Sequence, residues 1–210
     1  MSGIIAQNTL DNSGLIKSPA GGGAWNFIKK LTASGSGDLS FVDGTSDVVL
    51  DSTYREYLFT FTNIHPSATD GKFQFNLSAD SGSNYNVTKT TTIFRLIQYE
   101  NDGGSGIEYY TAGDLAQGTG FQILTHGYLG NDNDQSMSGS LRCFGLSDTT
   151  FVKHFMAETN YSNPDDSCSS AFVAGYGNTT SACDAVQFSM SSGNIDLGDI
   201  CLYGLTTWQV

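Results

Sequence analysis

The sequence predicts an all-β protein: an antiparallel, jelly-roll-like β-sandwich preceded by an extended N-terminal arm. Three observations support this prediction. Apolar residues recur with a period of two from Trp25 onward, and turn signals rich in Gly, Asn and Asp separate the alternating runs. Only 14% of the residues are charged. A surface covered by Ser, Thr, Asn and Gly is more typical of β-proteins than of helical enzymes, whose exposed faces carry Lys and Glu.

Residues 1–24 differ in composition from the rest of the chain. They are small and Gly-rich, and they end in the run PAGGGA over residues 19–24. A segment of this kind cannot bury a core of its own. It does carry spaced apolar residues, which are Ile4, Ile5, Leu10, Leu15 and Ile16. We therefore expect an arm that docks on a partner through these side chains, with a free tail as the alternative, and a single sandwich domain over residues 25–210.

The alternating runs define the strands. In residues 57–62, Tyr57, Phe59 and Phe61 fall on one face and the intervening residues on the other. The same period recurs in runs 73–78, 93–99, 121–124, 137–144, 151–156, 171–176, 186–190 and 200–204. With the turns between them, these runs predict about ten to twelve short strands. Residues 109–117 are predicted to hold one short helical turn, and the chain shows no strong internal repeat.

The last two alternating runs flank a polar turn, SSGN at residues 191–194. Two strands joined by a short turn that contains Gly are typical of a β-hairpin. We expect residues 186–204 to form such a hairpin, with a structural role in closing the sandwich.

The chain is acidic, since 9 Lys and Arg residues against 21 Asp and Glu residues give a net charge of −12. No Lys or Arg follows Lys153. Nucleic-acid binding is disfavoured, because a phosphate-binding surface needs clustered cations. The acidity is typical of a protein displayed at high local density, which charge repulsion keeps soluble, or alternatively of a salt-adapted proteome.

No targeting segment is evident in the sequence. The first residues lack the basic start and the apolar stretch of a signal peptide, and no apolar run approaches the length of a membrane span. We therefore expect synthesis in a cytosol and no membrane insertion.

The four cysteines form no CxxC pair. Cys143 and Cys201 lie within strand-like runs, so buried free thiols are expected. Cys168 and Cys183 flank a predicted strand, which leaves a disulfide between them as an alternative.

Residues capable of catalysis or metal binding form no recognisable motif. The histidines His65, His126 and His154 lie apart in the sequence and are expected to be ordinary strand and loop residues. The acidic runs 131–134 and 163–166 lack the spacing of a Ca²⁺-binding loop, so we expect solvated loop tips. The sequence therefore predicts a protein that is not an enzyme and holds no metal or cofactor.

Sugar binding is the main alternative to a purely structural role. Exposed aromatic and amide side chains on the rim of a β-sandwich bind glycans by stacking and hydrogen bonding. Tyrosines in predicted loops are candidates for a glycan site or for a protein interface, and these are Tyr85, Tyr109, Tyr110, Tyr128 and Tyr161.

Three stretches of the chain resemble a known family. They are FVDGTSDVVLDSTYREYLFTFTNIHPSATDGKFQF (residues 41–75), TTFVKHF (149–155) and FVAGYGNTTSACDAVQFSMSSGNIDLGDICLYGL (172–205). The openings SGII at 2–5 and SGLI at 13–16 resemble the leader that precedes such domains. The resemblance is to virion structural proteins of tailed phages that infect marine bacteria and cyanobacteria.

This resemblance implies a non-enzymatic protein on the virion surface, made in the host cytoplasm. A compact domain with a short arm favours a capsid decoration or short-fibre subunit, and we expect a homotrimer that contacts other capsid or tail proteins. The alternative is a tail-associated adhesin that recognises a host-surface glycan. A third hypothesis is a depolymerase that degrades host glycans, which requires an acidic pair in a groove.

Overall fold

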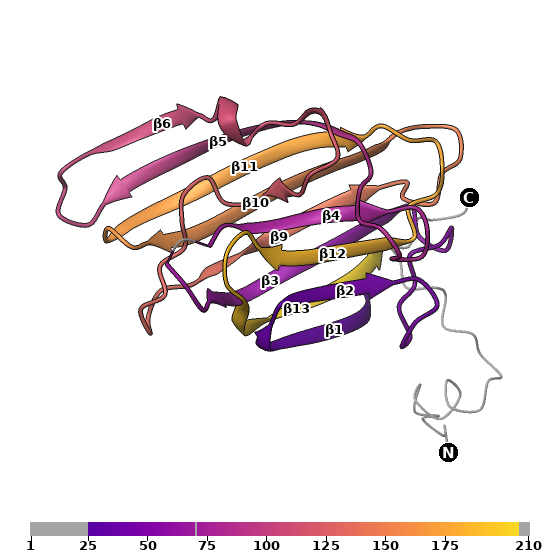
Figure 1. Cartoon of the computed structure of the whole chain (residues 1–210), viewed down its shortest axis with the longest axis horizontal. Coiled ribbons are helices and arrows are strands. Elements are labelled where there is room, and N and C mark those ends of the chain that lie inside the picture. Colours follow the sequence, from indigo (N-terminus) through magenta and orange to yellow (C-terminus); the bar gives the residue numbers. More distant parts are fainter. Residues whose placement is uncertain (1–24, 70, 206–210) are drawn as a thin grey trace, which may run out of the picture.

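The computed structural model describes residues 25–69 and 71–205, which form two antiparallel sheets packed face to face (Figure 1). The predicted all-β sandwich is confirmed, with thirteen strands in the described part of the chain instead of ten to twelve. The proposed arm, with Ile4, Ile5, Leu10, Leu15 and Ile16, lies outside the described residues.

The two sheets are unequal in size. The larger has nine strands, in the order β1-β13-β3-β9-β10-β11-β5-β6, with β7 also pairing with β5. Its strands are β1 (Trp25–Ser36), β3 (Glu56–Pro66), β5 (Lys89–Tyr99), β6 (Ser105–Tyr109), β7 (Ala116–Gly118), β9 (Met137–Phe144), β10 (Lys153–Asn163), β11 (Ser167–Gly177) and β13 (Ile195–Leu205). The smaller sheet has the order β2 (Asp38–Val42), β12 (Ala185–Met190), β4 (Phe73–Ser78) and β8 (Gln122–Ile123).

Helical structure is confined to one turn in the described residues. The 3₁₀ helix η1 (Thr111–Gly113) lies inside the predicted turn at 109–117. Over residues 25–69 and 71–205, no helix has the length and apolar character needed to cross a membrane.

The smaller sheet covers only part of the larger one. Figure 1 shows β2, β12 and β4 in front of the larger sheet, while β5 and β6 extend along its far edge. The segment between η1 and β9 covers the inner face of the remaining strands. Its Leu124 carbonyl accepts a hydrogen bond of 2.6 Å from Thr159 Oγ1, and its His126 amide donates to the Tyr161 hydroxyl at 2.9 Å. This covering segment creates the pocket described below.

Alternating burial along the strands explains why they form a sandwich. In β10, buried and exposed residues alternate from Lys153 to Tyr161, so one face meets the core and the other meets solvent. The core is dominated by aromatic side chains with little or no exposed surface. The phenylalanines of this cluster are Phe41, Phe59, Phe61, Phe73, Phe75, Phe155 and Phe188.

The predicted hairpin of residues 186–204 is wrong. β12 pairs with β2 and β4 in the smaller sheet, whereas β13 pairs with β1 and β3 in the larger one. The turn at residues 191–194 therefore carries the chain from one sheet to the other, with Gly193 at a φ of 71°. A period of two shows which face of a strand is buried, but it does not show which strand lies beside it.

All four cysteines are free thiols, which excludes the Cys168–Cys183 disulfide. Cys168 lies exposed on β11, while Cys183 is buried after that strand, so the two side chains occupy different layers. Cys143 is buried as predicted, and Cys201 is only partly buried.

Candidate functional site

A pocket of about 480 Å³ lies where the segment between η1 and β9 meets β5 and the end of β10. We call it the tyrosine pocket. It is lined by Lys72, Arg95, Tyr110, His126, Gly127, Tyr128, Asn163, Pro164 and Asp165. Its combination of aromatic rings with amide and charged groups is typical of a site that recognises a polar ligand.

Strand β5 positions the arginine of this pocket. Lys89, Thr91 and Ile93 are buried, and the same period places Arg95 on the inner side of the sheet. Arg95 Nη2 lies 3.0 Å from Glu108 Oε2 on the neighbouring strand β6. The ion pair orients the guanidinium beneath the pocket.

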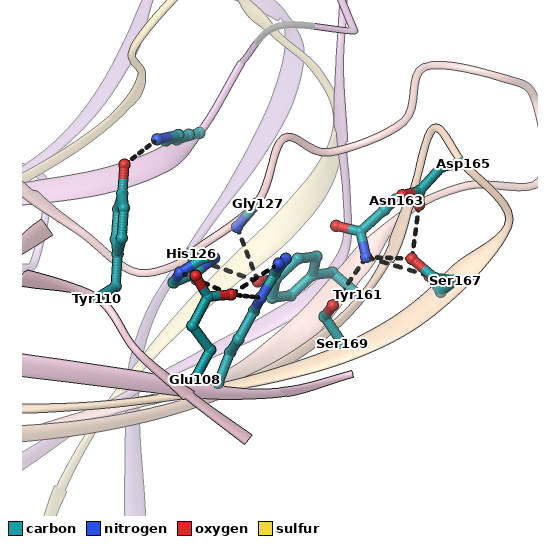
Figure 2. A network of polar contacts seen from close by, with 11 residues as sticks. Glu108, Tyr110, His126, Gly127, Tyr161, Asn163, Asp165, Ser167 and Ser169 are labelled. Atoms are coloured by element: carbon teal, nitrogen blue, oxygen red, sulfur yellow. Dashed lines mark hydrogen bonds and ion pairs between the residues drawn. The ribbon is translucent and has the colours of Figure 1, made fainter. Parts of the chain in front are cut away.

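Two tyrosines fix the position of His126, as Figure 2 shows. The Tyr161 hydroxyl accepts hydrogen bonds from the backbone amides of His126 and Gly127, at 2.9 and 3.0 Å. The Tyr110 ring packs against the imidazole with 4.0 Å between ring centroids. Burial, aided by the nearby Arg95 charge, lowers the pKa of His126 to about 4, so the imidazole is neutral at pH 7.

Lys72 closes the aromatic side of the pocket. Its Nζ donates a hydrogen bond of 3.2 Å to the Tyr110 hydroxyl. The same atom lies 5.1 Å from the ring centroids of both Tyr110 and Tyr128, within cation–π range. The Tyr128 ring is half exposed. It is therefore the aromatic surface most accessible to an entering ligand.

Buried polar atoms in this pocket lack partners. Asn163 Nδ2 donates to the hydroxyls of Ser167 and Ser169 at 2.8 Å each, which fixes the amide (Figure 2). Its Oδ1 is buried and has no hydrogen-bond partner among the described residues. Neither ring nitrogen of His126 has one there, and the closest acid, Glu108, lies 3.6 Å from Nε2. Buried groups of this kind are costly to leave unpaired.

The structure brings three of the five candidate tyrosines together. Tyr110 and Tyr128 line the tyrosine pocket, and Tyr161 supports it from below. Tyr109 lies on the opposite face of β6, where its hydroxyl donates to Asp114 Oδ2 at 2.5 Å. Tyr85 lies elsewhere, next to β4, where its carbonyl accepts a hydrogen bond from Asn76 Nδ2.

The other sequence candidates lie apart. His65 contacts the Asp132 carbonyl at 3.2 Å, and His154 is exposed on β10 beside Tyr176. In the part of the chain that the structure describes, no group of three or more His, Cys, Asp or Glu side chains is arranged to hold a metal ion. In the acidic run 163–166, Asp165 accepts a hydrogen bond of 2.6 Å from Ser167.

The solvent side of the larger sheet, which we call the outer face, is the second candidate functional feature. Large apolar side chains are exposed on it, and these are Phe94, Leu96, Ile107, Tyr109 and Met156. The rings of Phe94 and Phe172 stack there with centroids 5.0 Å apart. A shallow hollow of about 530 Å³ lies between Met156, Tyr176 and Phe144. Contiguous apolar surface of this kind is typical of protein–protein contacts.

Sequence reasoning missed Lys72, Arg95, Glu108, His126 and Asn163 as members of one site. Both faces of β5 carry apolar residues, so alternation does not decide between them, and the structure buries Ile93 and exposes Phe94 and Leu96. The available signal in the sequence is a charged residue, Arg95, that shares one face of its strand with the buried Ile93. Comparison with protein-family models, curated proteins and solved structures finds no match to the chain.

Proposed function

We propose that this chain is a non-enzymatic structural protein of a phage virion. In this proposal it is displayed on the particle surface as a capsid decoration or short-fibre subunit and is attached through residues 1–24. The apolar outer face is the observation that favours assembly. Ile107 and Met156 are 77% and 58% exposed, respectively. A partner surface packed over these apolar side chains removes them from water, which is favourable.

The proposed occupant of the outer face is a neighbouring copy of the chain. Trp25, the first described residue, lies beside this face, because the Arg142 guanidinium is 5.8 Å from its ring and 5.6 Å from that of Phe144. The 24 residues before Trp25 thus join the sandwich next to the hollow of the outer face. A copy packed there lies close to Trp25, where the proposed arm begins, which couples assembly to attachment.

Substitution of Met156 by Glu tests this assembly. Its 58% exposure means that the fold tolerates a charge, whereas an interface at this position must desolvate it. We expect the wild-type chain to form an oligomer at micromolar concentration, and Met156→Glu to run as a monomer with an unchanged circular dichroism spectrum. The measurement is size-exclusion chromatography with light scattering.

Tyr128→Glu is the matched control. Tyr128 is 50% exposed but lies in the tyrosine pocket, so the same charge there leaves the oligomer intact. A wild-type chain that stays monomeric at all concentrations contradicts the proposal. So does an oligomer that Met156→Glu leaves unchanged.

The tyrosine pocket favours a second candidate function, in which the chain is a tail-associated adhesin that binds a host-surface glycan. The observation behind it is the convergence of Tyr110 and Tyr128 with charged side chains in one pocket. The two functions use separate surfaces, so one chain can perform both.

A further inference from the structure

We propose that the tyrosine pocket binds an acidic sugar, whose carboxylate pairs with the ammonium group of Lys72. This inference rests on the second candidate function, glycan binding, and names its ligand class. The pocket volume of about 480 Å³ falls in the range of small-molecule sites and is sufficient for a monosaccharide. The half-exposed Tyr128 ring provides an apolar surface on which the C–H face of a sugar ring stacks.

Lys72 is a cation that lacks an acidic partner. It forms no ion pair with any of the described residues, although the chain has 21 Asp and Glu residues against 9 Lys and Arg residues. Its Nζ instead donates to the Tyr110 hydroxyl at 3.2 Å and lies 5.1 Å from the ring centroids of Tyr110 and Tyr128. An ammonium group carries three N–H donors, so this contact leaves donors for a ligand carboxylate.

The backbone holds this lysine in place at the pocket. The Lys72 amide donates to the Ser191 hydroxyl at 2.9 Å, and the Lys72 carbonyl accepts a hydrogen bond from the Ser191 amide at 2.9 Å. The next residue, Phe73, begins β4 and is fully buried. The ammonium group therefore extends from a fixed backbone position, which lowers the entropic cost of binding an anion.

The acidic groups around the pocket already have partners. Glu108 Oε2 lies 3.0 Å from Arg95 Nη2. Asp165, the carboxylate of the pocket lining, accepts a hydrogen bond of 2.6 Å from Ser167 Oγ. Lys72 is only partly exposed, so water screens its charge less than it screens a charge on the open surface. A ligand carboxylate pairs with this ammonium group, whereas a neutral sugar leaves it without a counter-charge.

The pKa of His126 shows the sign of the local field. Burial is the largest cause of its lowered pKa. The effect of the Arg95 charge, which lowers this pKa further, exceeds the opposing effect of Glu108, and Lys72 adds to the lowering. The charges at the pocket therefore act as a net positive field, in a chain whose net charge is −12. This local field favours a carboxylate.

The test is a binding measurement on the full-length chain by saturation-transfer NMR and calorimetry. The acidic probes are the methyl glycosides of glucuronic, galacturonic and mannuronic acid. Their neutral matches are the methyl glycosides of glucose, galactose and mannose, which differ only in a hydroxymethyl group that replaces the carboxylate. Acetate and inorganic phosphate supply a charge without a sugar ring. We expect at least one uronide to bind about tenfold more tightly than its neutral match, and more tightly than acetate and phosphate.

Two variants and one control locate the charge that binds the ligand. Lys72→Met removes the charge but keeps an unbranched side chain, and we expect it to weaken uronide binding about tenfold while binding of the neutral match is unchanged. Lys72→Arg keeps the charge and is expected to retain the preference for the uronide. Lys30→Met is the control, because it removes the same charge from a side chain that is 49% exposed on β1, at the opposite edge of the larger sheet from β6. We expect this control to leave both affinities unchanged.

Each other outcome overturns a defined statement. Neutral glycosides that bind as tightly as their uronides overturn the acidic ligand class while keeping glycan binding. A preference for uronides that Lys72→Met leaves unchanged excludes Lys72 as the partner of the carboxylate. Acetate or phosphate that binds more tightly than every uronide overturns the sugar ligand. Failure of every probe overturns this inference together with the adhesin candidate, and the assembly proposal then depends on Met156→Glu alone.

Discussion

Phe188→Ala is expected to destabilise the sandwich by about 3–5 kcal/mol, the largest effect of any single substitution considered. Phe188 is fully buried on β12, and its ring centroid lies 5.3–6.4 Å from those of five other phenylalanines. These rings come from both sheets, so the substitution opens a cavity between the two layers. The surrounding backbone is fixed by strand pairing and cannot collapse into it.

Urea unfolding at neutral pH, followed by circular dichroism, measures this effect. Phe151→Ala is the control, because Phe151 is 69% exposed and its truncation changes the free energy of unfolding by about 0.5 kcal/mol or less. A loss of less than about 1.5 kcal/mol in Phe188→Ala would mean that the two sheets do not pack as described.

The second large expected effect is that the free energy of unfolding increases with pH because of Lys89. Its side chain is fully buried on β5, where Nζ donates to the Asn76 Oδ1 atom and, at 2.7 Å, to the Val87 carbonyl. Burial lowers the pKa of Lys89 from 10.5 to about 8. The unfolded chain therefore binds this proton more tightly, which costs the folded state about 3 kcal/mol below pH 8.

The sign follows from the proton count. As pH rises from 7 to 9, folded Lys89 loses its proton while the unfolded side chain keeps it, so folding becomes more favourable by about 1.3 kcal/mol. The buried thiols of Cys143 and Cys183 act in the opposite direction near pH 9, because burial raises their pKa values. The readout must therefore isolate the lysine.

Lys89→Met provides that isolation, since it keeps an unbranched side chain without a charge. We expect the free energy of unfolding of the wild type, relative to Lys89→Met, to increase by about 1.3 kcal/mol between pH 7 and 9. Urea titrations of both proteins at four pH values measure this difference. A constant difference across the range would falsify the shifted pKa of Lys89.

The strand pattern was predictable because it depends on neighbouring residues. Tyr57, Phe59 and Phe61 alternate in the sequence and are all buried in β3. The order of strands was not predictable, since β12 and β13 are consecutive yet belong to different sheets. Pairing depends on contacts between distant segments, which a period of two does not encode.

The tyrosine pocket shows the same limit. Two of its tyrosines were identified as candidates, because exposed aromatic residues in loops are visible in the sequence. Lys72, Arg95 and Asn163 come from three separate segments, and only the fold brings them together. Arg95 points inward because it shares one face of β5 with buried Ile93, and hydrophobicity alone does not select this face, since Phe94 and Leu96 lie on the other.

Cryo-electron microscopy of the intact particle that carries this chain tests the proposed virion role most directly. The proposal predicts regular copies of the sandwich over the particle surface, with neighbouring copies in contact through the outer face around Met156 and residues 1–24 along the shell. Density confined to the tip of the tail, with the tyrosine pocket facing outward, contradicts the decoration role and favours the adhesin. Absence of the chain from the particle contradicts both.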